Sequence, residues 1–536
     1  MKQGLHSLDY VVFFIYFIAV SSYGFWIYKK KSNKETSSTD YFLAEGSLTF
    51  WAIGASLIAS NISAEHFIGM SGSGFAIGLA IASYEWMSAA TLIVVAIFFV
   101  PIYLKNKIYT MPQFLRQRYN PVVATTMAIF WLLLYVFVNL TSILYLGALA
   151  LEVTAGIDFT WAIAALAVFA IIITVGGMKV IGYTDVIQVV VLIAGGLVTT
   201  YLAMDLVAKH FGNPNVFSAF GTLRTQAEPH FHMILKKDNP YFKDLPGLSV
   251  IIGAMWVNNL NYWGCNQYII QRTLGASLPV ARKGILFAAS LKLIIPIIVV
   301  LPGIAAYVLF QNGMFQTEML DANGVVKPDH AYPVLLDLLP SGLKGMAFAA
   351  LTAAIVASLA GKANSISTIF TLDIYKEYIK PDASEKHLIR VGRVAIWVAM
   401  GIAAIIAPQL RVLEQAYQFI QEYSSFITPG VFAIFFLGFF WKRTTGNAAL
   451  VAALLTIPLS TAFKFWYSEI PFLDRMGIIF LILIAVIVLV TLADPKSKNN
   501  PKGLEIEASM FKVSTGFLIC SILICGILGA LYCVFW

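Results

Sequence analysis

Long apolar stretches follow one another along almost the whole chain. A hydrocarbon core about 30 Å thick is crossed by about 20 apolar residues of α-helix. These runs are continuous, unlike the alternating segments of about ten residues that form membrane β-barrels. The pattern predicts an all-α, polytopic membrane protein of about 14 transmembrane helices, at residues 8–28, 48–76, 77–104, 121–151, 158–177, 182–208, 248–271, 284–310, 345–375, 388–408, 412–440, 446–466, 471–493 and 514–536.

The charges between the apolar runs predict how the chain is oriented. The first run is followed by a basic cluster, Lys29, Lys30, Lys31 and Lys34, and no small-residue cleavage pattern follows it. It is therefore typical of a retained helix and not of a signal peptide. In the predicted topology, Lys and Arg are more numerous on the side of this cluster. Because basic loops face the cytoplasm, we expect a multi-pass cell-membrane protein with both termini on the outer side.

The composition agrees with this topology. Hydrophobic residues make up 59% of the chain and charged residues 12%, against about a quarter charged in ordinary soluble domains. The net charge of +8 is explained by inner loops that face anionic lipid, so it indicates no nucleic-acid partner. The four cysteines, Cys265, Cys520, Cys525 and Cys533, suggest neither a disulfide framework nor a metal site.

Two of the predicted spans contain polar residues that a lipid-facing helix would avoid. A charged group in the bilayer centre costs about 2.5–3.5 kcal/mol on insertion scales unless it lines a cavity or finds a partner. We therefore expect both helices to be unwound near the middle of the membrane. The polar residues are Ser60, Asn61, Ser63, Glu65 and His66 in the first of these spans, and Asn258, Asn259, Asn261, Asn266 and Gln267 in the second.

The interrupted spans occupy positions one and six when counting begins at the second span. This spacing predicts a core of two inverted five-helix repeats, in which freed carbonyls bind a cation and helix ends face a polar substrate. The expected organisation is 1–47 as an extra N-terminal helix and basic inner loop, 48–208 as the first repeat, 209–247 as an external loop, 248–440 as the second repeat and 441–536 as extra C-terminal helices.

Four stretches carry a specific resemblance to a known family. They are Gly54 to Trp86 (GASLIASNISAEHFIGMSGSGFAIGLAIASYEW), Gly176 to Gln188 (GGMKVIGYTDVIQ), Trp256 to Thr273 (WVNNLNYWGCNQYIIQRT) and Asn364 to Tyr378 (NSISTIFTLDIYKEY). The chain resembles the sodium/solute symporter family, and most closely its sodium/glucose and sodium/galactose cotransporter branch, over essentially its whole length. The resemblance implies alternating-access symport of a sugar such as glucose or galactose, with sodium as the coupling ion, no other cofactor and no enzymatic activity.

The resemblance also implies a sugar site. The positions that match the family's sugar contacts are Asn61, His66, Glu85, Ser88, Asn259, Lys292 and Gln421. Tyr262 matches the inner aromatic gate, and the further pocket residues are Tyr84, Tyr135, Trp263, Tyr417 and Met70.

The chemistry of these residues suits a sugar independently of the family. Sugar hydroxyls both donate and accept, so their site needs amides, a carboxylate and an ammonium, and an aromatic plate for the apolar ring face. Glu85 and Ser88 are three residues apart, and Tyr417 and Gln421 are four apart, so each pair shares a helical face. A single polar residue in a span often only joins two helices. Seven of them in five spans favour a substrate pocket.

The resemblance places the sodium ion between the first broken helix and the span at 345–375. The matching positions are Ala59, Ile62, Ala354, Ala357 and Ser358. The family pattern has serines at the last two positions, so Ala357 removes one hydroxyl ligand. We expect sodium to drive transport but to bind more weakly.

Lys362 adds a charge close to this cation position. It follows Ser358 by four residues, which is about 6 Å along a helix. Its ammonium would repel sodium or stand in for it, unless it extends into the inner aqueous cavity. Asp185, which matches a position on the family's inner sodium exit, would offset the added charge.

Several alternatives remain open at this point. One is proton-coupled or uncoupled transport of a sugar or of another small polar solute, such as an amino acid, a vitamin or sialic acid. Glu85 disfavours a carboxylate substrate, since two anions would then meet in a low-dielectric pocket. Another is a sugar-gated sensor or channel on the same fold, which would not accumulate sugar. A nucleotide-binding enzyme is disfavoured, because the glycines at 69, 72, 74 and 78 follow no predicted strand.

Overall fold

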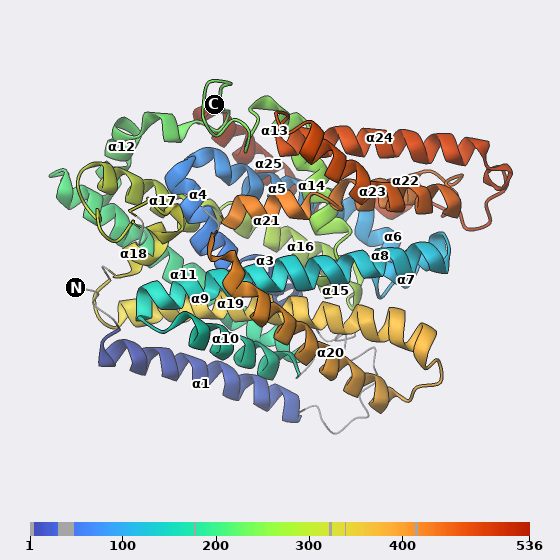
Figure 1. Ribbon diagram of the computed structural model, residues 1–536, viewed down its shortest axis with the longest axis horizontal. Coiled ribbons are helices and arrows are strands. Elements are labelled where there is room, and N and C mark those ends of the chain that lie inside the picture. The colour runs from blue at the N-terminus through green and yellow to red at the C-terminus, as the bar shows by residue number, and fades with distance from the viewer. Residues whose placement is uncertain (1–4, 31–47, 176–177, 321–323, 338, 413–415) are drawn as a thin grey trace.

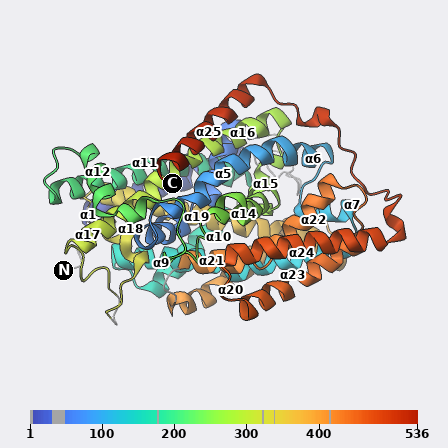
Figure 2. The ribbon, with the colours of Figure 1, turned by 90° about the horizontal axis from the view of Figure 1, so that it is seen from above.

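The computed structural model describes residues 5–30, 48–175, 178–320, 324–337, 339–412 and 416–536. Lys31 and Lys34 of the predicted basic cluster lie outside the described residues, as do Gly176 and Gly177. The described chain is almost entirely helical and contains no strand beyond one isolated bridge, between Leu320 and Val326. Its long helices lie side by side along the longest axis of the molecule (Figures 1 and 2). The predicted all-α fold is confirmed.

The first half of the chain forms the following helices: α1 (Ser7–Lys30), α3 (Phe50–Asn61), η1 (Glu65–Met70), α4 (Ser71–Ala76), η2 (Leu79–Ala82), α5 (Ser83–Val94), η3 (Val95–Phe99), α6 (Val100–Lys105), α7 (Met111–Arg118), α8 (Pro121–Leu133), η4 (Leu134–Leu140), α9 (Thr141–Ala155), α10 (Phe159–Thr174), α11 (Met178–His210), α12 (Val216–Gln226) and η5 (Glu228–Phe231).

The second half forms α13 (Leu248–Ile252), α14 (Ala254–Gly264), α15 (Gln267–Leu274), α16 (Leu278–Lys292), α17 (Ile295–Gln311), η6 (Pro328–His330), α18 (Ala331–Asp337), α19 (Leu343–Thr368), η7 (Ile369–Ile379), α20 (Glu385–Ile406), η8 (Ala407–Val412), α21 (Ala416–Ser424), α22 (Thr428–Phe440), α23 (Gly446–Trp466), α24 (Phe472–Ala493), η9 (Pro495–Ser497), η10 (Ala508–Phe511) and α25 (Thr515–Val534).

Fewer of the described helices have the length and composition of a membrane span than the sequence pattern predicts. Ten of the described helices are long and apolar enough to cross a bilayer, or eleven if α21 and α22, which meet at 47°, form one span. The predicted count of about 14 is therefore not confirmed. The windows 48–76 and 248–271 are divided into shorter helices, and the described part of the window 158–177 contains the 16-residue helix α10.

The two predicted helix breaks are present. α3 ends at Asn61, Ile62 has extended backbone (φ −78°, ψ 120°), and helical structure resumes in η1 at Glu65. α14 ends at Gly264, and α15 begins at Gln267 after two non-helical residues. Each break leaves backbone groups free of the helical hydrogen-bond ladder, so both sites can bind side chains or ligands.

Helix α19 lies in the interior of the bundle. Almost all of its side chains are buried, and it packs against α1, α3, α9, α10, α11 and α20. By contrast, the outer helices expose large apolar side chains, for example Phe14 and Ile18 on α1, Trp161 on α10, and Ile522 and Leu523 on α25. An apolar exterior around a partly polar interior is the arrangement that a lipid bilayer requires.

Candidate functional site

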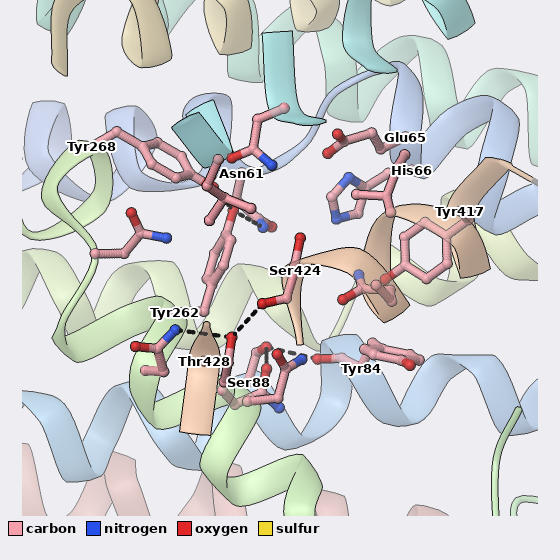
Figure 3. A pocket seen from close by; sticks show the side chains of 18 of the residues that line it. Asn61, Glu65, His66, Tyr84, Ser88, Tyr262, Tyr268, Tyr417, Ser424 and Thr428 are labelled. Carbon is pink, nitrogen blue, oxygen red and sulfur yellow. Dashed lines mark hydrogen bonds between the residues drawn. The ribbon is translucent and has the colours of Figure 1, made fainter. Parts of the chain in front are cut away.

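A polar cavity lies inside the bundle, beside both helix breaks. Side chains from η1, α5, α14, α15, α19, α21 and other helices converge on it (Figure 3). Its lining residues are Asn61, Glu65, His66, Tyr84, Glu85, Ser88, Leu134, Asn139, Asn258, Asn259, Asn261, Tyr262, Asn266, Tyr268, Lys362, Tyr417, Ile420, Gln421, Ser424 and Thr428.

The Glu85 carboxylate is held between two nitrogen groups. Lys292 Nζ donates to Glu85 Oε2 at 2.5 Å, and His66 Nε2 lies 3.3 Å from Glu85 Oε1. Lys292 also donates to the side-chain oxygen of Asn61. All four side chains are buried. Charge-assisted hydrogen bonds of this kind fix the carboxylate in one position, where its remaining lone pairs can accept hydrogen bonds from a ligand.

Tyrosine hydroxyls connect the two helix breaks. Asn61 Nδ2, at the end of α3, donates to Tyr262 Oη at 2.9 Å, and the Tyr268 hydroxyl donates to the same oxygen. The Tyr262 ring contacts Trp263 edge to face, with ring centroids 5.1 Å apart. The Tyr262 side chain therefore lies where movement of either broken helix would shift it.

Another part of the lining offers polar atoms without partners. Ser88 Oγ donates to the carbonyl oxygen of Tyr84 at 2.7 Å and also lies 3.1 Å from Asn259 Oδ1. The Tyr84 hydroxyl, Asn259 Nδ2 and Asn261 Oδ1 are buried and have no hydrogen-bond partner among the described residues. Because buried polar groups are nearly always hydrogen-bonded, these atoms are available to a polar ligand or to water.

A second buried ion pair lines the cavity. Lys362 Nζ, on α19, lies 3.6 Å from Glu65 Oε2, on η1. Ser142 Oγ donates to Glu65 Oε1 at 2.9 Å, and the ammonium lies 5.2 Å from the centroid of the Tyr268 ring. Sequence reasoning did not include Glu65 among the site residues. The signal that could have identified Glu65 is its place beside His66 in an interrupted span.

The structure brings most of the predicted substrate and pocket residues together. Asn61, His66, Glu85, Ser88, Asn259 and Gln421 line the cavity, as do Tyr84, Tyr262 and Tyr417. Lys292 does not line it and reaches it through Glu85 and Asn61. Tyr135, Trp263 and Met70 are buried outside the lining; Tyr135 donates to Asn266, and Trp263 lies under the Lys292 ammonium at 4.9 Å.

The predicted cation residues lie where α19 crosses the end of α3. Ser358 Oγ donates to the carbonyl oxygen of Ser60 at 3.2 Å, next to the helix break. The other predicted positions, Ala59, Ile62, Ala354 and Ala357, are all buried. Carbonyl and hydroxyl oxygens at this crossing have the donor chemistry that sodium prefers.

The two predicted modifiers of the cation path have partners of their own. Lys362 is 2% exposed and faces Glu65, so it does not extend into bulk solvent in this conformation. Asp185 accepts a hydrogen bond from Ser56 and lies 3.9 Å from Arg272. Arg272, not Lys362, is thus the charged group that the structure pairs with Asp185.

Comparison with known proteins gives a consistent result. A model of the sodium:solute symporter family matches residues 41–456. The chain is 48% identical to a sodium/glucose cotransporter of Vibrio parahaemolyticus, over 100% of this chain and 99% of that protein. It is 33% identical to the human sodium/myo-inositol cotransporter 2, over 87% of this chain and 72% of that one.

A solved structure supports the fold. A Na⁺-coupled sialic acid symporter, in its substrate-bound outward-open state, superposes with a TM-score of 0.78 and 23% sequence identity. The match covers 91% of this chain and 98% of that one.

Proposed function

We propose that this chain, which belongs to the sodium:solute symporter family, carries a neutral sugar such as glucose or galactose across the cell membrane together with sodium. Family membership makes it a multi-pass membrane transporter and not an enzyme. One observation carries the substrate class. The cavity holds a fixed carboxylate, several amides, tyrosine rings and unpartnered polar atoms in one place.

This set of groups suits a ring of hydroxyls. Glu85 accepts hydrogen bonds, Asn259 and Gln421 both donate and accept, and Tyr262 or Tyr417 offers an aromatic face for the apolar side of the ring. Lys292 neutralises Glu85 and keeps it in position. Because each carboxylate that lines the cavity faces an ammonium, the site suits a neutral solute better than a charged one.

The sodium site that we propose lies between the break after α3 and helix α19. Its ligands are the backbone oxygens of Ala59, Ile62 and Ala354 and the hydroxyl of Ser358. Ala357 supplies no side-chain oxygen. The contact from Ser358 to the Ser60 carbonyl supports this place, because it brings hydroxyl and carbonyl oxygens together at a helix break. With one ligand fewer, sodium is expected to bind weakly.

Transport in this proposal is an exchange of conformations, in which the repeats 48–208 and 248–440 rock against each other around the cavity. Both termini lie outside the cell, because the basic loops face the cytoplasm. Sodium favours the state that binds sugar, and by thermodynamic reciprocity sugar tightens sodium by the same factor. A potential of 100 mV adds about 2.3 kcal/mol per charge moved inward, equivalent to a sugar gradient of about fiftyfold at one-to-one stoichiometry.

Purified protein in proteoliposomes tests the proposal. With a sodium gradient directed inward, radiolabelled glucose or galactose is expected to accumulate above its external concentration. Replacement of sodium by choline, or collapse of the gradient with an ionophore, is expected to abolish the accumulation. Uptake that is the same in choline would overturn sodium coupling. Entry that never exceeds the external concentration would instead indicate a sugar-gated channel or sensor.

A further inference from the structure

The two ion pairs of the cavity differ in how tightly they are made. Lys292 Nζ lies 2.5 Å from Glu85 Oε2, within charge-assisted hydrogen-bond distance. Lys362 Nζ lies 3.6 Å from Glu65 Oε2, beyond the 2.7–2.9 Å typical of such bonds. Both lysines are buried. The Lys362 ammonium is therefore held less closely to its carboxylate than the Lys292 ammonium is.

Two hydroxyl groups also contact the Glu65 carboxylate. Ser142 Oγ, on α9, donates to Glu65 Oε1 at 2.9 Å and also contacts the carbonyl oxygen of Asn139 at 3.0 Å. Ser63 Oγ, in the helix break, donates to Glu65 Oε2 at 3.3 Å. A carboxylate and two hydroxyls thus meet at the start of η1, and one of the hydroxyls also contacts a backbone carbonyl. Hard cations prefer oxygen donors of these kinds.

We propose that Glu65, Ser63 and Ser142 form a second site for a monovalent cation of the size of sodium, in which the Lys362 ammonium is a tethered occupant. The proposal rests on the sodium-coupled function argued above. When Lys362 faces Glu65, the site is filled from within the protein and takes up no ion. When the ammonium turns away, the same oxygens admit a free cation.

The position of Lys362 relates this second site to the first. Lys362 and Ser358 are one turn apart on α19, and Ser358 contacts the carbonyl oxygen of Ser60 at the same helix break. The fixed charge of Lys362 therefore repels an ion at the first site while it occupies the second. Both effects reduce the number of sodium ions that the protein binds and weaken the binding of those that remain.

Lys362→Met tests this inference, since methionine keeps much of the side-chain volume and removes the charge. It leaves Glu65 as a buried carboxylate without its counter-ion, a state that is costly unless another cation replaces the ammonium. We expect the purified variant to bind one more ²²Na⁺ per chain than the wild type. The sodium concentration at half-maximal sugar uptake is expected to fall by about tenfold, which corresponds to about 1.4 kcal/mol of binding free energy.

Three further variants separate the new site from a general effect of mutation. Lys362→Met combined with Glu65→Gln is expected to lose the extra sodium, because the carboxylate ligand is gone. Lys362→Arg keeps the charge and is expected to gain no sodium. Lys344→Met removes another buried lysine of α19, one paired with Asp337 at 2.6 Å, and is also expected to gain none.

The outcomes distinguish this inference from the proposed function. A Lys362→Met protein that binds no more sodium than the wild type, while wild-type uptake still requires sodium, overturns the second site and leaves symport intact. Wild-type uptake that is unchanged in choline overturns sodium symport itself. If Lys362→Met does not fold, Lys362→Gln, which is also neutral, is measured in its place under the same criteria.

Discussion

Lys292 and Glu85 form an ion pair, 2.5 Å from nitrogen to oxygen, in which both side chains are buried inside the bundle. The pair joins the last residue of α16 to the first turn of α5. Removing one partner of a buried pair costs about 3–5 kcal/mol, because the other charge is left without compensation. Glu85 is therefore both a structural counter-ion and the fixed carboxylate that faces the cavity.

Substitution of Glu85 separates these two roles. Glu85→Gln is expected to lower thermal stability and to reduce sugar uptake at low sugar concentration by at least about tenfold. The double variant Glu85→Gln with Lys292→Met contains neither charge, so it is expected to recover stability while uptake stays low. Thermal unfolding in detergent and the KM for sugar in proteoliposomes are the measurements. Recovery of uptake in the double variant would mean that Glu85 only neutralises Lys292.

Tyr262 gives a second prediction, which concerns the gate. Tyr262→Phe removes the hydroxyl that accepts a hydrogen bond from Asn61 at 2.9 Å but keeps the ring. It is expected to lower uptake by only a few fold, because one hydrogen bond contributes about 1 kcal/mol. Tyr262→Ala removes the ring, and is expected to allow sugar exchange while sodium-driven accumulation is lost.

Counterflow and steady-state accumulation in the same vesicles measure these two properties of the Tyr262 variants. Tyr268→Phe, which removes the hydroxyl that donates to Tyr262, is the matched control and is expected to behave like Tyr262→Phe. Full accumulation by Tyr262→Ala would exclude the ring as a gate.

The sequence was sufficient for the features that depend on average polarity along the chain. Apolar windows located the helices, and clusters of amides and serines located the breaks after Asn61 and Gly264. Both signals are local, because lipid penalises a polar residue wherever it is placed on the helix surface. The predicted count of about 14 spans stays a prediction. It depends on where helices shorten or change type, as in the 16-residue helix α10 or the π-helical segment η1.

Contacts between residues that are far apart in the chain could not be predicted from the sequence. Lys362 was expected to act near Ser358, one turn away, but its partner Glu65 lies on η1, almost 300 positions earlier. That contact depends on how α19 crosses the break, which no local pattern encodes. Likewise, direct contact between Lys292 and sugar stays a prediction, but the partners of its ammonium, Glu85 and Asn61, were not evident from the sequence. A lysine side chain is long enough for several arrangements, and the packing of the helices decides which side chains it meets.

The next prediction concerns Ala357, where a substitution is expected to strengthen sodium binding. Ala357→Ser restores a hydroxyl next to Ser358, at the crossing of α19 and α3. An additional oxygen ligand contributes about 1 kcal/mol if it is comparable to a hydrogen bond. The sodium concentration at half-maximal uptake is therefore expected to fall by about fivefold.

Ala360→Ser is the matched control for this substitution, because it adds the same hydroxyl to a buried position of α19 outside the proposed ligand set. It is expected to leave the sodium dependence of uptake as it is in the wild type. An equal response of the two serine variants would contradict a ligand role at position 357.

The last prediction concerns Asp244, in the loop between η5 and α13. Burial, and to a smaller extent the nearby Glu422 carboxylate, raise the pKa of this carboxyl from 3.8 to about 6. Because the folded-state pKa lies above the unfolded value, Asp244 contributes stability that is fully present below about pH 4 and is lost as pH rises from about 4 to about 6. Asp244→Asn carries no charge at either pH. It is therefore expected to raise the Tm above that of the wild type at pH 8, and to differ little from it at about pH 3.5, below the unfolded pKa. Differential scanning fluorimetry of the two detergent-solubilised proteins measures this, and a Tm difference that is the same at both pH values would exclude titration of Asp244 as its cause.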